Sequence, residues 1–539
     1  MLPRTAAEVL SSHVTFEIRS VDRMLLTLRQ PRLQYGSGIQ GFFCRHRGWR
    51  YVSSKLMLPM TEAFAAEIHH YITSRDLDLI HFGRDDRKDD IAKEYLAQHD
   101  GGERILFVGR AQERARVWRT RSRRDPATGR RYPWLYRESA MPNHWYFYGF
   151  DRDIGPFFIK FCGYFPFTAE VYLNGHEYAK QQATRAGIGF TAADNSFAEV
   201  EDAAAVQQIC DGLTPERISR FVGKWLARLP HPFTVADEEA DYHWELTIQQ
   251  LELATTQVLD RPACGRIFFD QLIHDNLDIG HPDKVRLVFD RQIRRRGRGR
   301  TPGSFRTQVI TDGVDPYLYL YYKKNHVKQY LKKGSALRTE TTINSPADFG
   351  IGKALTHLPA LAQIGYTANR RLLDVECLSH DPATGLAAFT ALTSPVVSDT
   401  GTRIPALRFT DPRAQALLAA CCALALLPTG FTNSDLRRHL APLLGLTPEV
   451  MTSGQLSYDL RRLRAHGFIE RIGDTRRYQL TPTGLAHALF LTHLIKHFLI
   501  PGISQVSDPN PLPGSRLRTA SRAYQAAVDD LARRAHLAA

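Results

Sequence analysis

The sequence predicts a multidomain α+β protein with an N-terminal α/β region, a central mixed-sheet region and a C-terminal domain built mainly from helices. The chain has 539 residues. At roughly 150 residues per domain, that length predicts three or four units. Hydrophobic residues make up 43% of the chain and charged residues 23%, which is typical of a folded protein. Strand-like alternation and helix-like periodicity also succeed each other along most of the chain.

The first two regions are expected at 1–110 and 111–265. In the first, strands at 14–19, 23–28, 76–82 and 104–108 alternate with helices at 59–73 and 89–98, as in an α/β domain. The second opens with a basic loop, in which DPATG at 125–129 predicts a turn. Aromatic-rich strands follow at 132–137, 144–150 and 156–161, then a helix at 168–186, and helices dominate from there to about 260.

The third region, 266–404, is expected to open with helix and to become a basic sheet. Its strands are predicted at 307–311, 317–322, 326–330 and 336–343. Before them lies a segment dense in arginine and glycine at 291–306, expected to be a loop or hairpin tip. Its candidate nucleic-acid-binding residues are Arg294, Arg295, Arg296, Arg298 and Arg300.

The fourth region, 405–500, has the most specific pattern, and a tail with one last helix follows at 501–539. Helical patterns at 411–427, 433–444 and 453–466 precede two short strands at 468–471 and 477–481, and another helix starts near Thr483. Helix, helix, third helix and a two-stranded wing is the order of a winged-helix fold. The segment GQLSYDLRRLRAHGFIERIGDTRRYQLTPTG resembles the core of many bacterial winged-helix regulators.

The third of these helices is expected to contact nucleic acid. Leu456, Leu460 and Leu463 form its inner face. Its outer face then presents Gln455, Tyr458, Asp459, Arg461, Arg462 and Arg464, and the wing adds Arg476 and Arg477. Such side chains reach phosphates and base edges. The alternative is a winged helix that binds another protein.

Charge and cysteine content narrow the class of protein. The net charge of +14 favours polyanionic partners. The seven cysteines include no CxxC pair, which argues against a zinc ribbon or a disulfide framework and fits a reducing cytosol. Cys421 and Cys422 lie in an apolar helical pattern and are expected in its core. Neither a signal peptide nor an apolar run long enough to cross a membrane is visible. We therefore expect a cytoplasmic protein that does not insert into membranes.

Two strands of the third region are expected to place several reactive side chains close to one another. In the predicted hairpin at 326–343, Lys328 and Tyr330 share one face of their strand, and Arg338 and Glu340 share a face of theirs. Glu340, Tyr330 and Lys328 are thus candidate catalytic residues for metal-assisted phosphodiester chemistry. The alternative is a cross-strand salt bridge with aromatic packing.

This stretch also resembles plasmid and conjugative-element rolling-circle replication initiators. Their strand with the pattern YxK matches Tyr330 and Lys332, and their Arg-x-Glu strand matches Arg338 and Glu340. The resemblance covers some 30 residues and implies nicking of DNA for a mobile element. The His-hydrophobic-His metal motif of that family has no counterpart in this sequence.

A broader resemblance, spanning nearly the whole chain, is to a widespread family of uncharacterised bacterial proteins. It is carried by 150–182, by GRAQERARVWRT at 109–120, and by VKQY with LRTETTIN. It implies no activity and no catalytic residues.

Four acidic residues are candidate Mg²⁺ ligands. Asp89 and Asp90 lie in a charged segment between a strand and a helix, and Asp151 and Asp153 follow a strand. The alternatives are an Asp-rich helix N-terminus for the first pair and a hairpin turn for the second.

Arginines and aromatic residues interleave between 119 and 148. Arg121, Arg123 and Arg124 lie near Trp118, Trp134 and Tyr136 in sequence, a mixture that suits phosphate contact and base stacking. An ordinary hairpin with core aromatics is the alternative.

Taken together, the sequence predicts a nucleic-acid-binding protein associated with a mobile element, with Mg²⁺-dependent cleavage as a further expectation. The alternatives are a non-enzymatic DNA-binding regulator and an RNA-binding partner of a structured RNA. The expected partner is a nucleic acid, either DNA or RNA.

Overall fold

The computed structural model describes the chain except for residues 1–9, 11, 84, 263–264, 267–268, 270–287, 290–306, 313–314, 333–334, 378–381, 398–400, 425–429, 508–514 and 535–539. The chain divides into two compact units. The sheet unit comprises His13–Ile273 and Gly299–Arg370. The helical unit comprises Arg371–Ala539 with Met1–Ser12 and His274–Arg298. The five arginines expected at 294–300 lie outside the described residues.

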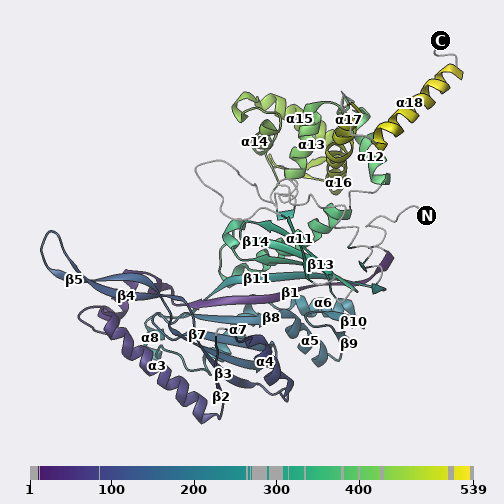
Figure 1. The fold of residues 1–539 in the computed structure, drawn as a ribbon. Coiled ribbons are helices and arrows are strands. Elements are labelled where there is room, and N and C mark those ends of the chain that lie inside the picture. The colour runs from purple at the N-terminus through teal and green to yellow at the C-terminus, as the bar shows by residue number, and fades with distance from the viewer. Residues whose placement is uncertain are drawn as a thin grey trace. The chain divides into compact units, whose positions relative to one another are not determined.

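A mixed sheet of 11 strands organises the sheet unit (Figure 1). In spatial order the strands are β12 (Thr307–Asp312), β13 (Asp315–Tyr322), β14 (Asn325–Lys332), β15 (Ala336–Ile343), β11 (Glu245–Leu259), β1 (Val14–Arg29), β8 (Ala169–Asn174), β7 (Gly155–Cys162), β6 (Asn143–Asp151), β3 (Arg104–Gln112) and β2 (Asp78–His81). Neighbours are antiparallel except β2 and β3, which are parallel and joined through α4 (Lys88–Ala97). Strands from all three regions expected at 1–110, 111–265 and 266–404 are therefore neighbours in one sheet.

The long strands β1 and β11 connect the two halves of this sheet. β1 pairs with β11 along its length and with β8 along its second half. The expectation of helix up to about residue 260 is wrong here, because Glu245–Leu259 is a strand. Its Leu, Gln, Glu and Ala residues form helices readily, but pairing with β1 and β15 overrides that preference.

The helices of the sheet unit are α2 (Gly36–Gln40), α3 (Ser54–Ser74), α4, α5 (Gly175–Arg185), α6 (Ala203–Asp211), α7 (Pro215–Leu226), α8 (Val235–Glu239) and α11 (Leu358–Cys377), of which α11 runs on into the helical unit. A small hairpin joins β9 (Phe190–Ala192) and β10 (Phe197–Val200). The helix expected at 168–186 begins only at Gly175, because Asn174 ends β8 and caps α5: its side-chain oxygen accepts hydrogen bonds from the backbone N–H groups of His176 and Glu177.

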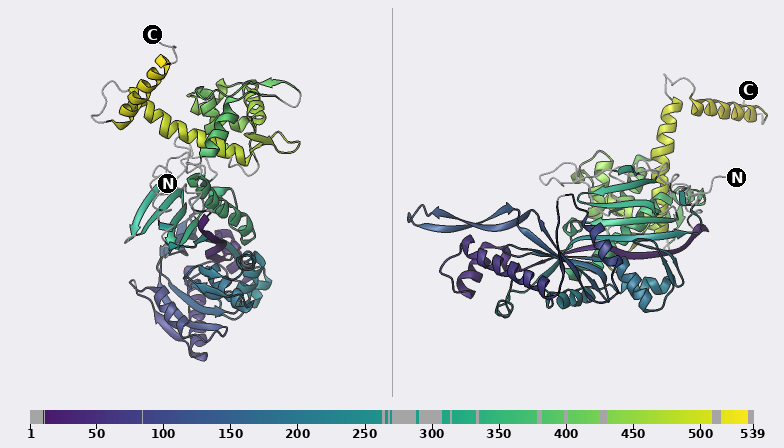
Figure 2. Two further views of the ribbon diagram at one scale, coloured as in Figure 1. Left: turned by 90° about the vertical axis from the view of Figure 1, so that its right-hand side faces the viewer. Right: turned by 60° about the horizontal axis from the view of Figure 1, so that its bottom comes forward.

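A separate two-stranded hairpin, which we call the arm, consists of β4 (Ala115–Arg124) and β5 (Arg131–Ala140). It extends away from the main sheet (Figure 2, right). The basic stretch expected as a loop is therefore mostly strand. The turn expected at 125–129 is confirmed: the Asp125 carboxylate accepts a hydrogen bond from the backbone N–H of Ala127 at 2.9 Å.

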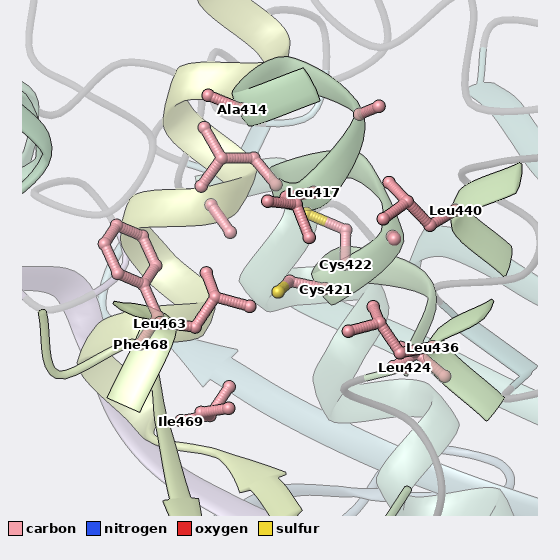
Figure 3. Close-up of a cluster of buried hydrophobic side chains, with 14 of the residues drawn as sticks. Ala414, Leu417, Cys421, Cys422, Leu424, Leu436, Leu440, Leu463, Phe468 and Ile469 are labelled. Carbon is pink, nitrogen blue, oxygen red and sulfur yellow. The ribbon is translucent and has the colours of Figure 1, made fainter. Parts of the chain in front are cut away.

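The helical unit contains α12 (Pro382–Thr393), α13 (Pro412–Leu424), α14 (Asn433–Leu443), α15 (Ser453–Ala465), α16 (Pro482–His493), α17 (Ile500–Ser507) and α18 (Arg516–Arg534). Two short hairpins, β16 (Val396–Val397) with β17 (Arg403–Ile404) and β18 (Ile469–Arg471) with β19 (Tyr478–Leu480), complete it. Figure 3 shows its core, where Leu417 and Cys421 of α13 meet Leu436 of α14 and Leu463 of α15. Cys421 and Cys422 are buried here, as expected.

Candidate functional site

A polar pocket of about 570 Å³ lies on one face of the main sheet. Strands β1, β11, β13, β14 and β15 contribute its floor, and α4, α5 and the β9–β10 turn contribute its walls. Its lining residues are Asp22, Arg23, Lys93, Glu177, Lys180, Asp194, Asn195, Glu252, Tyr319, His326, Lys328, Tyr330, Lys332, Glu340 and Thr342. This volume falls within the range of about 300–1,000 Å³ found for small-molecule sites.

Strand register explains which side chains share the floor. Tyr319, Lys328 and Glu340 lie opposite one another on β13, β14 and β15. On β1 the register shifts between Val21 and Met24. Asp22 and Arg23 lie in this irregularity, and both line the pocket although neighbours on a regular strand point to opposite faces.

A buried arginine ties the floor together. The Arg338 side chain has no exposed surface, and its guanidinium contacts Asp22 Oδ2 at 2.7 Å and also Glu340. It further donates to His176 Nε2 at 3.1 Å and to the carbonyl oxygen of Asn195. A buried cation is tolerated only when its charge and its N–H groups are satisfied in this way.

Burial and Arg338 act against each other on the two carboxyl groups. Burial raises the pKa of Asp22 above its ordinary value, although Arg338 opposes the shift. Burial would also raise the pKa of Glu340, but Arg338 and the Tyr330 hydroxyl outweigh it and lower that pKa. Glu340 is therefore ionised at neutral pH and pairs with Arg338 as a carboxylate. Burial and then Arg338 lower the pKa of His176 well below its usual value, so its ring is neutral and accepts the Arg338 hydrogen bond.

Two groups at the pocket have pKa values near neutrality. Burial and the neighbouring Asp22 raise the pKa of Glu252 to about 7. Burial and Arg338 lower the pKa of Lys332 to about 8. Groups with pKa values in this range exchange protons at physiological pH, which is common in binding and catalytic sites.

The structure brings Glu340, Tyr330 and Lys328 together, as the strand pattern predicts. The Tyr330 hydroxyl donates to Glu340 Oε1 at 2.9 Å, and burial with the Glu340 charge raises the pKa of Tyr330. A phenol with a raised pKa is a poor nucleophile. This geometry matches the alternative of a cross-strand ionic network more closely than a nucleophile beside a metal.

The four expected metal ligands do not come together. Asp151 is buried and accepts hydrogen bonds from Trp225 Nε1 at 2.8 Å and from the backbone N–H of Ile154 at 3.0 Å, and it pairs with Lys224. Asp153 pairs with Arg185. The other two, Asp89 and Asp90, are exposed in the first turn of α4, where the helix dipole favours them. In the part of the chain that the structure describes, no three His, Cys, Asp or Glu side chains form a group suited to a metal ion.

Cations and aromatic rings lie face to face on the arm. The guanidinium of Arg123 lies 4.2 Å from the centre of the Trp134 ring, and that of Arg121 lies 5.3 Å from the Tyr136 ring. Trp134 is 38% exposed and Tyr132 39%. Arg121, Arg123 and Arg124 are all exposed, as the interleaved pattern of the sequence implies.

The base of the arm is anchored to the sheet unit. Trp118 Nε1 donates to the carbonyl oxygen of Leu33 at 3.1 Å, and Arg137 donates to the carbonyl oxygen of Gln34 at 2.9 Å. An isolated two-stranded hairpin is only marginally stable in water. These contacts hold the arm's base, while its basic outer half faces solvent.

In the helical unit, the basic residues expected on α15 and on the β18–β19 hairpin are partly exposed. Arg461, Arg464 and Arg476 are exposed, and none of the ion pairs between described residues involves them. Tyr458 is 43% exposed and lies beside Arg461, with 5.8 Å between ring centre and guanidinium. Gln455 is exposed, and its side chain accepts from the N–H of Thr452 in a capping box.

Three other residues that were expected on this exposed face are buried or half-buried and have interaction partners. Asp459, expected outside, is buried and accepts a hydrogen bond from Arg413 Nη2 at 2.6 Å. Arg462 is half-buried and donates to the carbonyl oxygen of Ala406 at 2.6 Å. Arg477 is half-buried and has an interaction partner. Helical spacing places residue 459 beside the core position 463, so the ion pair with α13 covers it.

Sequence reasoning missed Asp22 and Glu252 as pocket residues, and it missed His176 as a partner of Arg338. Asp22 and Glu252 interrupt the apolar strands SVDRMLL and LELA. A charged residue inside a buried strand is the signal that would have found them, because burial of charge is costly without a partner.

In comparisons with protein-family models, with curated proteins and with solved structures, no match to this chain was found. None of the helices described here is both long and apolar enough to cross a membrane. The class of the protein therefore has to be argued from its own residues.

Proposed function

We propose that this protein binds nucleic acid, through the arm of the sheet unit and through α15 with the β18–β19 hairpin of the helical unit. The observation that carries the proposal is the outer half of the arm, where exposed Arg123 lies over the exposed ring of Trp134 and exposed Arg121 lies over the half-buried ring of Tyr136. Arginine neutralises phosphates, and aromatic rings stack on bases. A two-stranded ribbon also fits a nucleic-acid groove.

The helical unit supports the same function. Its element order of α13, α14, α15 and the β18–β19 hairpin is the order of a winged helix, in which α15 would be the recognition helix and the hairpin the wing. Arg461 and Arg464 on α15 and Arg476 on the hairpin would contact phosphates or base edges. We also propose that the protein is cytoplasmic and that it is associated with a mobile genetic element.

The test is a fluorescence anisotropy titration of the full chain with labelled duplex DNA, single-stranded DNA and structured RNA over a range of salt concentrations. The double variant Arg121→Ala/Arg123→Ala should weaken binding and make the slope of log K against log salt shallower by about 1.8 on duplex DNA, because each arginine that neutralises a phosphate contributes about 0.9 to that slope. The matched control is Arg104→Ala/Arg220→Ala, which removes the same charge from exposed positions off the arm. Equal slopes for the two double variants would contradict the proposal.

The nature of the nucleic acid needs a separate measurement. Gentle purification at low salt followed by sequencing of the copurifying nucleic acid distinguishes a preferred DNA site from one defined RNA species. A preferred DNA site would support a DNA-binding regulator, and one defined RNA species would support a protein that binds a structured RNA.

A further inference from the structure

Aromatic rings surround a lysine on the pocket floor. The Lys328 ammonium lies 4.2 Å from the ring centre of Tyr330, 4.7 Å from that of Tyr317 and 5.9 Å from that of Tyr319. The rings of Tyr319 and His326 are 5.7 Å apart. This part of the floor therefore offers flat apolar surface and a cation side by side, which suits a group that is both aromatic and anionic.

The charges of the pocket leave two lysines available for a ligand. Asp22 and Glu340 both pair with Arg338, and Glu177 pairs with Lys180. Neither Lys328 nor Lys332 takes part in any of the ion pairs between described residues. The pKa of Lys332 is lowered because burial and the positive charge of the neighbouring Arg338 both disfavour its charged form. An anion bound between these lysines would relieve that repulsion.

Glu252 adds a group of different chemistry at the same pocket. A carboxyl group that is partly protonated near pH 7 donates a hydrogen bond in one state and accepts in the other. Sugar hydroxyls and the edges of bases offer both donors and acceptors. The pocket therefore combines flat rings, cations and a proton-exchanging carboxyl group within about 570 Å³.

We propose that this pocket binds a nucleoside phosphate, with the base against Tyr319 and His326 and the phosphate between Lys328 and Lys332. The ligand comes either as a free nucleotide or as an unpaired nucleotide of a bound strand. Only the second source rests on the proposed function.

Isothermal titration calorimetry of the full chain at pH 7 tests the proposal with adenosine 5′-monophosphate, inorganic phosphate and adenosine as probes. The monophosphate should bind at least about tenfold more tightly than either fragment, because only it makes both stacking and charged contacts. Equal binding of inorganic phosphate, or no heat with the monophosphate at millimolar concentration, would overturn the proposal.

Two variants test whether Tyr319 and Lys328 contact the ligand. Tyr319→Leu and Lys328→Met should each weaken monophosphate binding by about tenfold. Lys324→Met is the matched control, because Lys324 is exposed at the β13–β14 turn and does not line the pocket. This variant should bind the monophosphate as tightly as the unmodified chain does. Tryptophan fluorescence checks that each variant is folded, and Lys332→Met replaces Lys328→Met if the latter is not. Monophosphate affinity unchanged in all folded variants would place the ligand elsewhere and overturn the proposal.

A single-stranded pentanucleotide distinguishes the two sources. Competition between it and the monophosphate, with both weakened by Tyr319→Leu, assigns the pocket to an unpaired nucleotide of a strand. Monophosphate binding without competition assigns it to a free nucleotide. If the chain binds duplex through the arm but binds no monophosphate, the pocket proposal alone fails; if it binds monophosphate but no nucleic acid, the proposed function alone fails.

Discussion

At the scale of single residues, Arg338 controls the chemistry of the pocket. It is fully buried and has two carboxylate partners on different strands, Asp22 on β1 and Glu340 on β15. Such a network is costly to disrupt, because removal of one partner leaves a buried charge without compensation. Substitutions here act on stability before they act on any reaction.

Glu340→Ala should lower the free energy of unfolding of the sheet unit by about 3 kcal/mol, because Arg338 is left with a single carboxylate partner. Glu340→Gln should cost less, since its amide oxygen still accepts from Tyr330 and Arg338. All six tryptophans lie between Trp49 and Trp244, so their fluorescence during urea titration reports this unit. Equal stability of the Ala variant and the unmodified chain would contradict this role. Loss of a cleavage activity in Glu340→Ala would accordingly not identify Glu340 as catalytic unless Glu340→Gln also lacked it.

Glu252 should make the sheet unit less stable as pH rises from about 4.5 to about 7. Its folded pKa of about 7 lies above its unfolded value, so the folded state binds more protons in this window and loses stability with rising pH. The effect is on the order of 3 kcal/mol. Glu252→Gln should remove it, raising stability at pH 8 relative to the unmodified chain while changing little at pH 4.5. A variant that is less stable at pH 8 would refute this reading of Glu252.

At the scale of elements, the strands β12 to β15 were predictable, and the pairing of β15 with β11 was not. The alternation in HVKQY and ALRTETTI places Lys328 and Tyr330 on one face of their strand and Arg338 and Glu340 on one face of theirs. In the structure, Lys328 lies opposite Glu340 and Tyr330 lies opposite Arg338. The contribution of β1 and β11 was not predictable, because those strands reach the pocket through pairing between segments over 200 residues apart in the chain. Local pattern contains no information about such pairing.

The arm's charges and its second strand, expected at 132–137, were recognised from sequence, but its first strand, β4, was expected as a loop. Arg-rich segments usually indicate a loop, whereas here rings such as Trp134 and Tyr136 cover the arginine side chains of the paired strand. Cross-strand pairs of this kind stabilise a hairpin that has no second sheet beneath it.

On α15, Arg461→Ala should weaken duplex binding by about 1–3 kcal/mol if Arg461 reads a base edge, and should reduce the preference for the best sequence. Arg438→Ala on α14 is a suitable control, since that exposed arginine pairs with Asp435 within its own helix. Anisotropy titrations with the copurified sequence and a scrambled duplex measure both quantities. If Arg461→Ala weakens both duplexes equally, the residue contacts phosphate rather than bases.

At the scale of the whole molecule, the two units have separate cores. Leu417 belongs to the core of the helical unit, whereas Phe107 and Tyr148 pack in the sheet unit. The sequence located the helical unit well, because its helices pack with neighbours close in the chain. It described the sheet unit as three regions, because the strands of one sheet come from residues 14 to 343.

Separate cores predict separate unfolding. Leu417→Ala should destabilise the helical unit by about 2–5 kcal/mol, because Leu417 is fully buried. In urea, the part of the far-ultraviolet circular dichroism change that belongs to this unit should then occur at lower denaturant, while the tryptophan transition stays in place. A matching shift of the tryptophan transition would mean that the two units unfold as one.

The pairing of β1 also has a consequence for synthesis on the ribosome. Its long partner β11 begins 216 residues after β1 ends, so at about 5–20 residues per second one edge of β1 waits roughly 10–40 s for its neighbour. During that interval an apolar strand with open hydrogen-bonding groups is available to chaperones and to other nascent chains. Production of this protein should accordingly gain more from added chaperones than its final stability would suggest.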